Sequence, residues 1–447
     1  MTSLPIPFIK RMQAQLGQEF EDFQASLDTI PPVSIRLNPN KNGQVPNQEL
    51  DDGQIPWCSD AYYLQKRPTF ILDPHLHGGS YYVQEASSMF LQTVLRQLQA
   101  DGFTPTRALD LCAAPGGKST LIASFLPATS LLVANEVIKT RAAILKENLI
   151  KWGQDNVVIT NSDPSRFSTL SGAFDLILVD APCSGEGMFR KDEKAIEEWS
   201  ENNLRLCEER QKRILTDIWP ALRPNGFLIY STCTYNQLEN DGILAWLMDK
   251  FNATPISIQQ DFPGITRTRH GVQFYPHKTR GEGLFMGIVQ KNDGEDLRLK
   301  KEKQNTPRIK LSESTKQLLP DLSGYTTYCT GKTLGIIPTQ HAGFIQLLDN
   351  MANIIYKGCE IGEEIKGMLK PSPALALYSK LRQGQAQQMP LDLPNALQYL
   401  RREDLHGEIP AGDWLLLTYQ NTTLGWGKKV GDRLNNYYPK EWRIRNA

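Results

Sequence analysis

The chain has 447 residues, enough for about three domains that each bury a core. Its 40% apolar and 22% charged residues are ordinary for a globular protein, and 49 basic and 49 acidic residues leave no net charge. A polyanionic partner must therefore bind a local basic patch and not the whole surface. No apolar run reaches the roughly 18 residues of a membrane span, and the N-terminus lacks the apolar core of a signal peptide. We expect a cytoplasmic protein that does not enter a membrane.

Seven cysteines are scattered along the chain without a Cys-x-x-Cys pair or a Cys/His cluster at zinc spacing. They are Cys58, Cys112, Cys183, Cys207, Cys233, Cys329 and Cys359. An odd, dispersed set of this kind is typical of free thiols in a reducing compartment. We expect no metal site.

Apolar residues recur at three- and four-residue spacing over residues 5–30, which predicts amphipathic helices. Residues 33–39, which finish on a proline, are predicted as an edge strand. Aromatic residues follow, among them Trp57, Tyr62, Tyr63, Tyr81 and Tyr82. Such rings can stack on bases, but packing in a core is their more frequent use.

A helix from residue 87 to about residue 98 leads into a region where strands and helices alternate. This alternation predicts an α/β fold with a mostly parallel, doubly wound sheet and helices on both faces. The predicted strands are 106–111, 131–135, 156–160, 174–180, 227–232, 254–259 and 283–290, and the predicted helices are 117–126, 138–151, 193–222 and 237–251. Ligands of such sheets bind beyond the carboxyl ends of the strands.

Two breaks divide the C-terminal part of the chain. Residues 292–310 are highly charged with few apolar side chains, which predicts a linker, and Lys-Pro-Ser-Pro follows at residues 370–373. The expected domains are 1–95, 96–291, 292–375 (linker and intermediate domain) and 376–447. The last contains a strand-like run at 414–419 and ends in a basic, aromatic tail. RNA contact and core packing are equally compatible with that tail.

The stretch from Arg107 to Thr120 is predicted as a strand, a tight glycine turn and a helix. Such a turn lets backbone N–H groups approach a ligand closely, and the helix N-terminus favours acceptor atoms. It is no phosphate-binding loop, because Cys112 occupies the position of the first glycine, and no dinucleotide fingerprint, because a third glycine is missing. Glu136 closes the next strand, where an acid can accept hydrogen bonds from ribose hydroxyls. The pattern favours a nucleoside cofactor without a pyrophosphate, of which S-adenosylmethionine is the common one.

Two cysteines follow predicted strands. Cys183 comes after the strand that ends at Asp180, and Cys233 comes after the next strand. Successive strands are usually neighbours, so both thiols should emerge at one edge of the sheet, beside the glycine turn. A lone cysteine is most often a small buried hydrophobe, the interpretation kept for Cys112 in the glycine turn and for Cys207. Two at strand ends indicate that at least one is catalytic.

Two thiols suit the methylation of a pyrimidine at carbon 5, which is a weak nucleophile. A thiolate that adds to carbon 6 creates an enamine whose carbon 5 can attack a sulfonium methyl group. A second group can then act as a base or aid the release of the thiol. Asp180 can hydrogen-bond N3 or the exocyclic amine, which selects cytosine over uracil. These residues alone leave open which thiol attacks.

Motifs over nearly the whole chain resemble the Sun-domain RNA cytosine-5 methyltransferases and, within them, the bacterial ribosomal RNA small subunit methyltransferase F group. The motifs are Ser34–Asn38, Gly79–Met89, Asp110–Lys118, Asp180–Gly185 and Ser231–Thr234, with a weaker match of Leu424–Lys428 and Tyr437–Pro439 to a PUA-type RNA-binding module. The resemblance implies a class I (Rossmann-like) S-adenosylmethionine methyltransferase core, an N-terminal α+β domain and a C-terminal PUA-like domain. The implied partner is 16S ribosomal RNA, free or within the 30S subunit, and a monomer is expected.

The same resemblance implies roles for individual residues. Cys233 would be the nucleophile and Cys183 the helper in product release, whereas DNA cytosine methyltransferases attack with the cysteine of a Pro-Cys pair, here Cys183. The cofactor S-adenosyl-L-methionine would lie on Cys112, Ala113, Ala114, Pro115, Gly116, Gly117 and Lys118, with Glu136 at the ribose, Asp163 near the adenine, Asp180 near both the methionine moiety and the cytosine, and Arg141 as a further contributor. The alternative is a non-catalytic RNA-binding or ribosome-assembly factor with a vestigial cofactor pocket, which the intact motifs disfavour.

Overall fold

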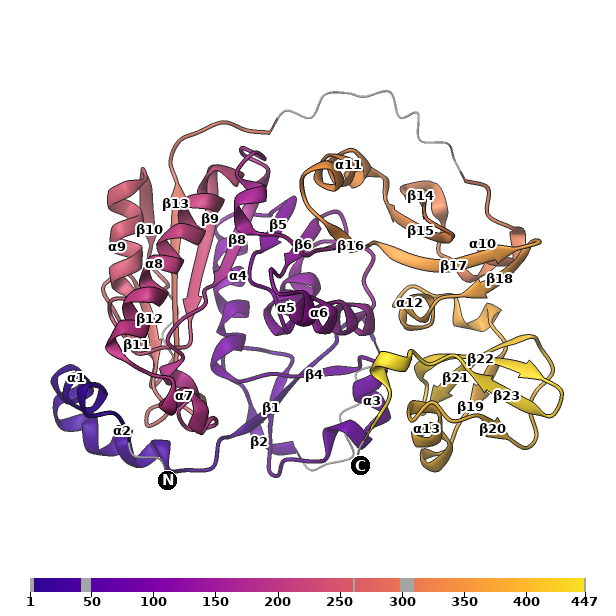
Figure 1. The fold of residues 1–447 in the computed structure, drawn as a ribbon, viewed down its shortest axis with the longest axis horizontal. Helices are drawn as coiled ribbons and strands as arrows, with labels where there is room; N and C mark the ends of the chain where they lie inside the picture. Colours follow the sequence, from indigo (N-terminus) through magenta and orange to yellow (C-terminus); the bar gives the residue numbers. More distant parts are fainter. Residues whose placement is uncertain (1–3, 42–49, 260–261, 298–308, 446–447) are drawn as a thin grey trace.

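The computed structural model describes residues 4–41, 50–259, 262–297 and 309–445. Its strands form four sheets, of which the largest lies in the middle of the molecule (Figure 1). Most of the predicted linker, residues 298–308, lies outside the described residues. In the described ranges no helix is both long and apolar enough to cross a membrane.

The largest sheet has ten strands and a parallel centre. Short, buried runs of Leu, Val, Ile and Ala pair in parallel in the order β7, β6, β5, β8, β9. Their bounds are β5 (Arg107–Asp110), β6 (Leu131–Asn135), β7 (Val157–Thr160), β8 (Phe174–Asp180) and β9 (Leu222–Thr232). Antiparallel strands extend both edges, namely β10 (Ala253–Ile256), β11 (Thr266–Arg267), β12 (Gly271–Phe274) and β13 (Leu284–Lys291) beyond β9, and β16 (Ile354–Lys357) beside β7. The predicted α/β sheet is confirmed.

Helices cover both faces of this sheet (Figure 1). On one face lie α4 (Leu91–Ala100), α5 (Gly117–Phe125) and α6 (Lys139–Trp152), and on the other lie α8 (Glu201–Ile218), α9 (Asp241–Lys250) and α11 (Ala342–Met351). Successive strand residues point to opposite faces, so Leu132 belongs to the first core and Val133 to the second. The predicted helix 193–222 divides into α7 (Glu193–Glu197) and α8, which begins where Ser200 accepts the Asn203 N–H.

The N-terminal segment begins with the predicted helices, α1 (Ile6–Leu16) and α2 (Phe20–Leu27). A four-stranded sheet follows, in the order β2, β3, β1, β4. Besides β1 it contains β2 (Leu50–Gln54), β3 (Ala61–Leu64) and β4 (Tyr81–Val83), and the short helix α3 (Pro74–His77) lies between β3 and β4 in the chain. The prediction that residues 33–39 form an edge strand is wrong, because β1 (Val33–Leu37) pairs with β3 and with β4. Pro39 lies beyond the end of β1, so its missing N–H does not interrupt either ladder.

Most of the N-terminal aromatic residues serve packing. Trp57, Tyr63 and Tyr81 are buried, and the Trp57 Nε1–H donates to the Ala86 carbonyl at 2.7 Å. Tyr62 and Tyr82 are half-buried. Packing is therefore the use of the three buried rings.

The C-terminal part contains two further sheets. The first comprises β14 (Tyr325–Thr330), β15 (Thr333–Pro338), β17 (Cys359–Ile365) and β18 (Met368–Pro371), beside α10 (Glu313–Leu318). After α12 (Pro373–Leu377) comes the second, with β19 (Gln388–Pro390), α13 (Leu393–Leu400), β20 (Leu405–His406), β21 (Trp414–Tyr419), β22 (Thr422–Val430) and β23 (Arg433–Asn436). The aromatic tail is split, because Tyr438 is buried while Arg433, Lys440 and Arg443 are exposed.

The last sheet packs against the N-terminal region. The His75 Nδ1 lies 2.8 Å from the Thr422 Oγ1, and the His77 Nδ1 lies 3.1 Å from the Tyr438 Oη. All four side chains are at most 8% exposed. The two ends of the chain therefore hold each other in a fixed arrangement.

Candidate active site

The two thiols meet at the carboxyl ends of neighbouring strands. β8 and β9 pair in parallel with Asp180 opposite Ser231, so the segments that follow them leave the sheet side by side. The Cys183 Sγ lies 3.3 Å from the Cys233 Sγ. All seven cysteines are within the described residues, and all are free thiols. The predicted convergence of Cys183 and Cys233 is present in the fold.

The surroundings of the two sulfur atoms differ. A hydrogen bond from Cys183 lowers the pKa of the Cys233 thiol and raises that of Cys183. Burial and the Glu239 carboxylate raise both pKa values, and at Cys233 the Asp180 carboxylate also raises the pKa while the Lys118 ammonium lowers it. Cys233 is therefore the sulfur that ionises more readily.

Lys118 and Asp180 form an ion pair beside the thiols. The Lys118 Nζ donates to the Asp180 Oδ2 at 2.8 Å, and the Ser231 hydroxyl donates to the Asp180 Oδ1 at 2.7 Å. Burial disfavours the charge on Lys118, but Asp180 outweighs it and raises the Lys118 pKa. The Asp180 side chain is 35% exposed, so the carboxylate is held in place and still open to a ligand.

The glycine turn connects β5 to α5. Gly116 has a φ of +117°, a conformation that favours glycine, and α5 begins at the next residue, Gly117. Within the described residues no side chain caps the first turn of α5, which leaves its N–H groups for an acceptor atom.

Below the turn lies Asp110, which is fully buried. Its Oδ2 accepts the Ser119 hydroxyl at 2.6 Å, while its Oδ1 has no partner among the described residues. Burial raises the Asp110 pKa to about 7. An uncapped helix start and an unpartnered buried oxygen fit a small polar ligand at this turn.

The remaining predicted cofactor residues follow β6 and β7, with Glu136 directly after β6, Arg141 in the first turn of α6 and Asp163 after β7. Glu136 is buried and accepts the Ile138 N–H at 2.9 Å. Arg141 links Glu136 to the glycine turn, because its Nη1 lies 3.7 Å from the Glu136 Oε2 and its Nη2 donates to the Ala114 carbonyl at 2.8 Å. Asp163 is half-exposed and accepts hydrogen bonds from the N–H and the hydroxyl of Ser165, which lower its pKa. The structure thus brings every predicted residue to the carboxyl edge of the parallel strands, the position of ligands in such sheets.

Several residues of this region had no predicted role. Besides Ser231, they include Glu239, which binds the Cys183 segment, and Arg36, which is buried at 2% exposure. Arg36 donates to the Thr120 Oγ1 at 2.6 Å and to the Gly117 carbonyl at 3.2 Å, and so holds α5 to β1. An arginine in a strand is usually solvated. Its only sequence signal is that it lies in the motif Ser34–Asn38.

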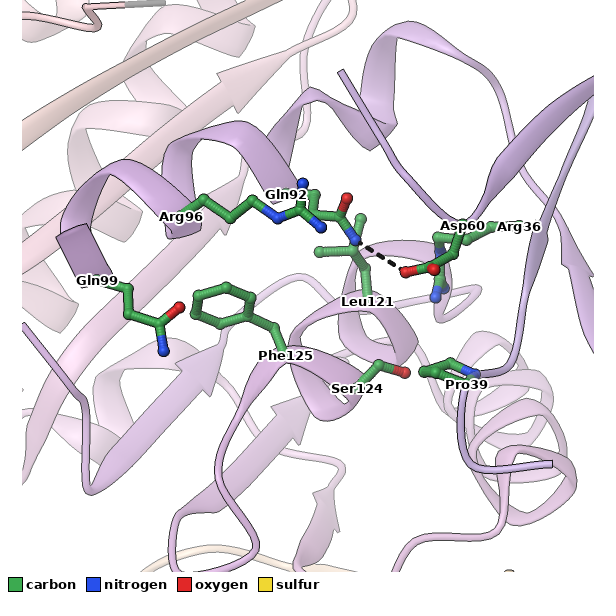
Figure 2. Close-up of a pocket in the computed structure, with 9 residues that line it drawn as sticks. All are labelled: Arg36, Pro39, Asp60, Gln92, Arg96, Gln99, Leu121, Ser124 and Phe125. Carbon is green, nitrogen blue, oxygen red and sulfur yellow. Dashed lines mark hydrogen bonds between the residues drawn. The ribbon is translucent and has the colours of Figure 1, made fainter. Parts of the chain in front are cut away.

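A separate cavity lies between β1, α4 and α5. It has a volume of about 310 Å³, and Figure 2 shows Arg36, Gln92, Arg96 and Phe125 around it, with Gln92 hydrogen-bonded to Asp60. None of the predicted catalytic or cofactor residues lines it. Over the described parts of the chain no group of three or more His, Cys, Asp or Glu side chains could hold a metal ion.

Known proteins resemble this chain over most of its length. It is 30% identical over 412 residues to "Ribosomal RNA small subunit methyltransferase F" of Shewanella loihica, covering 87% of this chain and 83% of that protein. The protein of the same name from Escherichia coli O81 is 29% identical over 472 residues, with 98% and 96% covered. The chain belongs to the family of ribosomal RNA small subunit methyltransferase F. The family predicted from the sequence motifs is confirmed.

Family models match three successive regions. They describe the N-terminal domain of 16S rRNA methyltransferase RsmF at residues 4–86, the 16S rRNA methyltransferase RsmB/F at 104–290 and the methyltransferase RsmF PUA domain at 386–444. Among solved structures, a methyltransferase homologue from Pyrococcus horikoshii has a TM-score of 0.52 at 22% identity, covering 64% of this chain and all of that one. NSun6 from Pyrococcus horikoshii with SFG has a TM-score of 0.55 at 18% identity, covering 65% and 99%. The predicted methyltransferase fold, flanked by an N-terminal domain and a C-terminal PUA domain, is confirmed.

Proposed function

We propose that this protein transfers the methyl group of S-adenosylmethionine to carbon 5 of a cytosine in 16S ribosomal RNA, with Cys233 as the nucleophile. The observation that carries the proposal is the 3.3 Å separation of two thiols beside the ion pair of Lys118 and Asp180. Membership of the methyltransferase F family supports the substrate class.

Cys233 is the better nucleophile of the two. A thiolate and not a thiol attacks carbon 6, so the sulfur with the lowered pKa is the one present in the reactive form. The hydrogen bond from Cys183 and the charge of Lys118 both lower the pKa of Cys233. The Cys183 thiol, whose pKa is raised, stays protonated and keeps donating to its neighbour.

Asp180 is the group that binds the base. Its carboxylate is oriented by Ser231 and Lys118 and lies two residues before the Pro182-Cys183 pair. A carboxylate at this point accepts a hydrogen bond from the exocyclic amine of cytosine or from protonated N3, and stabilises the ring as the sulfur adds. Uracil offers a carbonyl at that position, which the carboxylate repels.

The glycine turn would hold the cofactor, which supplies an electrophilic methyl group. The turn of residues 112–118 and the uncapped N–H groups at the start of α5 suit its carboxylate, and Glu136 suits the ribose hydroxyls. Arg141 keeps Glu136 and the turn together, and Asp163 stands at the end of the next strand. These residues bind and orient, and none of them exchanges a proton with the base.

Cys183 assists release. After methyl transfer, carbon 5 loses its proton to a base, the ring double bond re-forms and the bond between carbon 6 and the Cys233 sulfur breaks. The Cys183 S–H, 3.3 Å away, stabilises the departing thiolate by the same hydrogen bond that lowers its pKa in the free enzyme.

The test is incubation with methyl-labelled S-adenosylmethionine and either 16S RNA or 30S subunits, followed by digestion to nucleosides. Label in 5-methylcytosine is the expected result. Label in another nucleoside only, or none with either substrate, would overturn the proposal. RNA binding without cofactor binding in calorimetry would instead support a non-catalytic factor.

A further inference from the structure

A buried carboxylate, Glu239, lies beside the two thiols and has no part in the mechanism above. Its side chain is 0% exposed, and its Oε2 accepts the Ser184 N–H and the Gln211 Nε2–H, each at 2.9 Å. Its main-chain carbonyl accepts the Tyr230 hydroxyl at 2.7 Å, which fixes the residue to β9. A fully buried acid that accepts from three separate segments of the chain acts as a brace for them.

The brace encloses Cys183. Gln211 donates to the Pro182 carbonyl at 3.0 Å as well as to Glu239, while Glu239 accepts the Ser184 N–H. Pro182 and Ser184, on either side of Cys183, are therefore both bound to the hydrogen-bonded pair of Glu239 and Gln211. The backbone of Cys183 cannot shift without the loss of one of these buried hydrogen bonds.

Asn240, the residue after Glu239, braces the segment that carries Cys233. The Asn240 Nδ2–H donates to the Thr234 carbonyl at 3.0 Å, and its Oδ1 accepts the Thr232 hydroxyl, so both neighbours of Cys233 are bound to it. The Ser184 and Thr234 hydroxyls also lie 2.9 Å apart and join the two segments directly. Residues 239 and 240 thus hold one thiol segment each.

We propose that Glu239 is a positioning residue that holds the Cys183 sulfur against Cys233 through the Ser184 N–H and Gln211. The role depends on its hydrogen-bond acceptors and not on a charge, because a glutamine carbonyl at the same place can accept both bonds. The Glu239 Oε1 has no partner in the described part of the chain, and burial raises the pKa of the Glu239 carboxyl group to about 7. The inference rests on the proposed function for its effect on turnover, but not for its effect on the distance between the sulfurs.

The first test measures that distance without RNA. Phenylarsine oxide binds two adjacent thiols with loss of water, and intact-mass spectrometry counts the bound arsenical. The wild-type protein and Glu239→Gln should bind one equivalent that Cys183→Ser abolishes, and Glu239→Ala should bind it at least tenfold more slowly. Equal rates in Glu239→Ala and the wild type would overturn the proposal.

The second test measures turnover and the protein–RNA adduct on denaturing gels. A displacement of about 1 Å can cost up to roughly 100-fold in rate, so kcat of Glu239→Ala should fall ten- to 100-fold with accumulation of adduct, while the cofactor Kd stays unchanged. Gln211→Ala should act in the same direction, and Glu239→Gln should restore kcat to within about threefold of the wild type. Glu208→Ala, on the same helix as Gln211, is the control that leaves kcat unchanged.

The outcomes separate the two proposals. If the wild-type protein forms no 5-methylcytosine, the proposed function fails and the arsenical result still decides the role of Glu239. If the wild type is active and Glu239→Ala matches it, the positioning role fails alone. Loss of both activity and cofactor binding in Glu239→Ala, with no rescue by Glu239→Gln, would also overturn it, because such a result marks a charge or folding requirement.

Discussion

The Cys183 sulfur lies 3.3 Å from the Cys233 sulfur, although the two residues are 50 positions apart in the chain. Only one of them has both an ammonium group and a thiol donor that lower its pKa. The pair is therefore chemically asymmetric, and removal of one thiol should differ in effect from removal of the other.

Cys233→Ala should reduce methyl transfer at least about 1,000-fold, because no other group supplies the attacking thiolate. Cys183→Ala should instead form the bond to carbon 6 and release it slowly, so that protein stays attached to RNA on a denaturing gel. The double variant controls for non-specific crosslinking and should show no adduct. If the adduct forms in Cys233→Ala and not in Cys183→Ala, the two thiols have exchanged roles.

Lys118→Met should change the pH dependence of kcat/KM. The Lys118 ammonium lowers the pKa of Cys233, so its removal raises that pKa and decreases the thiolate fraction at neutral pH. The rising limb of the profile should therefore move to higher pH. Activity at pH 7 should fall about tenfold for each pH unit that the limb moves, with partial recovery in more alkaline buffer. Lys316→Met, at an exposed ion pair on α10, should leave the profile unchanged. An activity loss equal at all pH values would contradict this account of Lys118.

Arg11→Leu should destabilise the protein by about 2–3 kcal/mol, because it removes the cation paired with a fully buried carboxylate. The Arg11 Nη2 donates to the Glu186 Oε1 at 2.5 Å, and the same oxygen accepts the Trp199 indole N–H at 2.9 Å. Glu186 also accepts the Tyr235 N–H, so α1 helps to hold the segment after Cys233. Urea unfolding followed by fluorescence measures the change.

The double variant Arg11→Leu with Glu186→Gln completes a mutant cycle for that pair. We expect it to be more stable than Arg11→Leu alone, since no buried charge is then left without its cation. Additive effects of the two substitutions would mean that the ion pair contributes nothing beyond its separate contacts.

Assembled 30S subunits should be methylated at least about tenfold faster than naked 16S RNA. The C-terminal module is docked on the N-terminal region through His75 with Thr422 and His77 with Tyr438, which fixes the two flanking domains relative to each other. A pre-set arrangement of binding surfaces favours a substrate that is itself folded. Rates on naked RNA, 30S and 70S particles can be compared directly, and equal rates on all three would exclude recognition of a folded site.

Local patterns predicted much of the fold. The glycine turn, the alternation of strands and helices and the strand at 414–419 were all predicted, because hydrophobic periodicity and turn-forming residues are properties of neighbouring positions. The hairpin of β11 and β12 was not predicted, since strands of two and four residues are too short to show a period that can be told from chance. The position of β1 inside its sheet was also mispredicted, because a strand's own residues do not name its partners.

The amino-acid sequence by itself determined the family, the class of fold and the set of candidate catalytic and cofactor-binding residues, since all of these are recognised from motifs of contiguous residues. Only the tertiary structure decided which side chains meet. The order of the strands predicted that Cys183 and Cys233 lie at one edge of the sheet, but not their 3.3 Å contact. The contacts of Arg11 with Glu186 and of His75 with Thr422 span 175 and 347 positions. The braces formed by Glu239 and Asn240 likewise depend on how β8, β9 and α8 pack. Such contacts arise from the packing of whole elements, so no local pattern of residues encodes them.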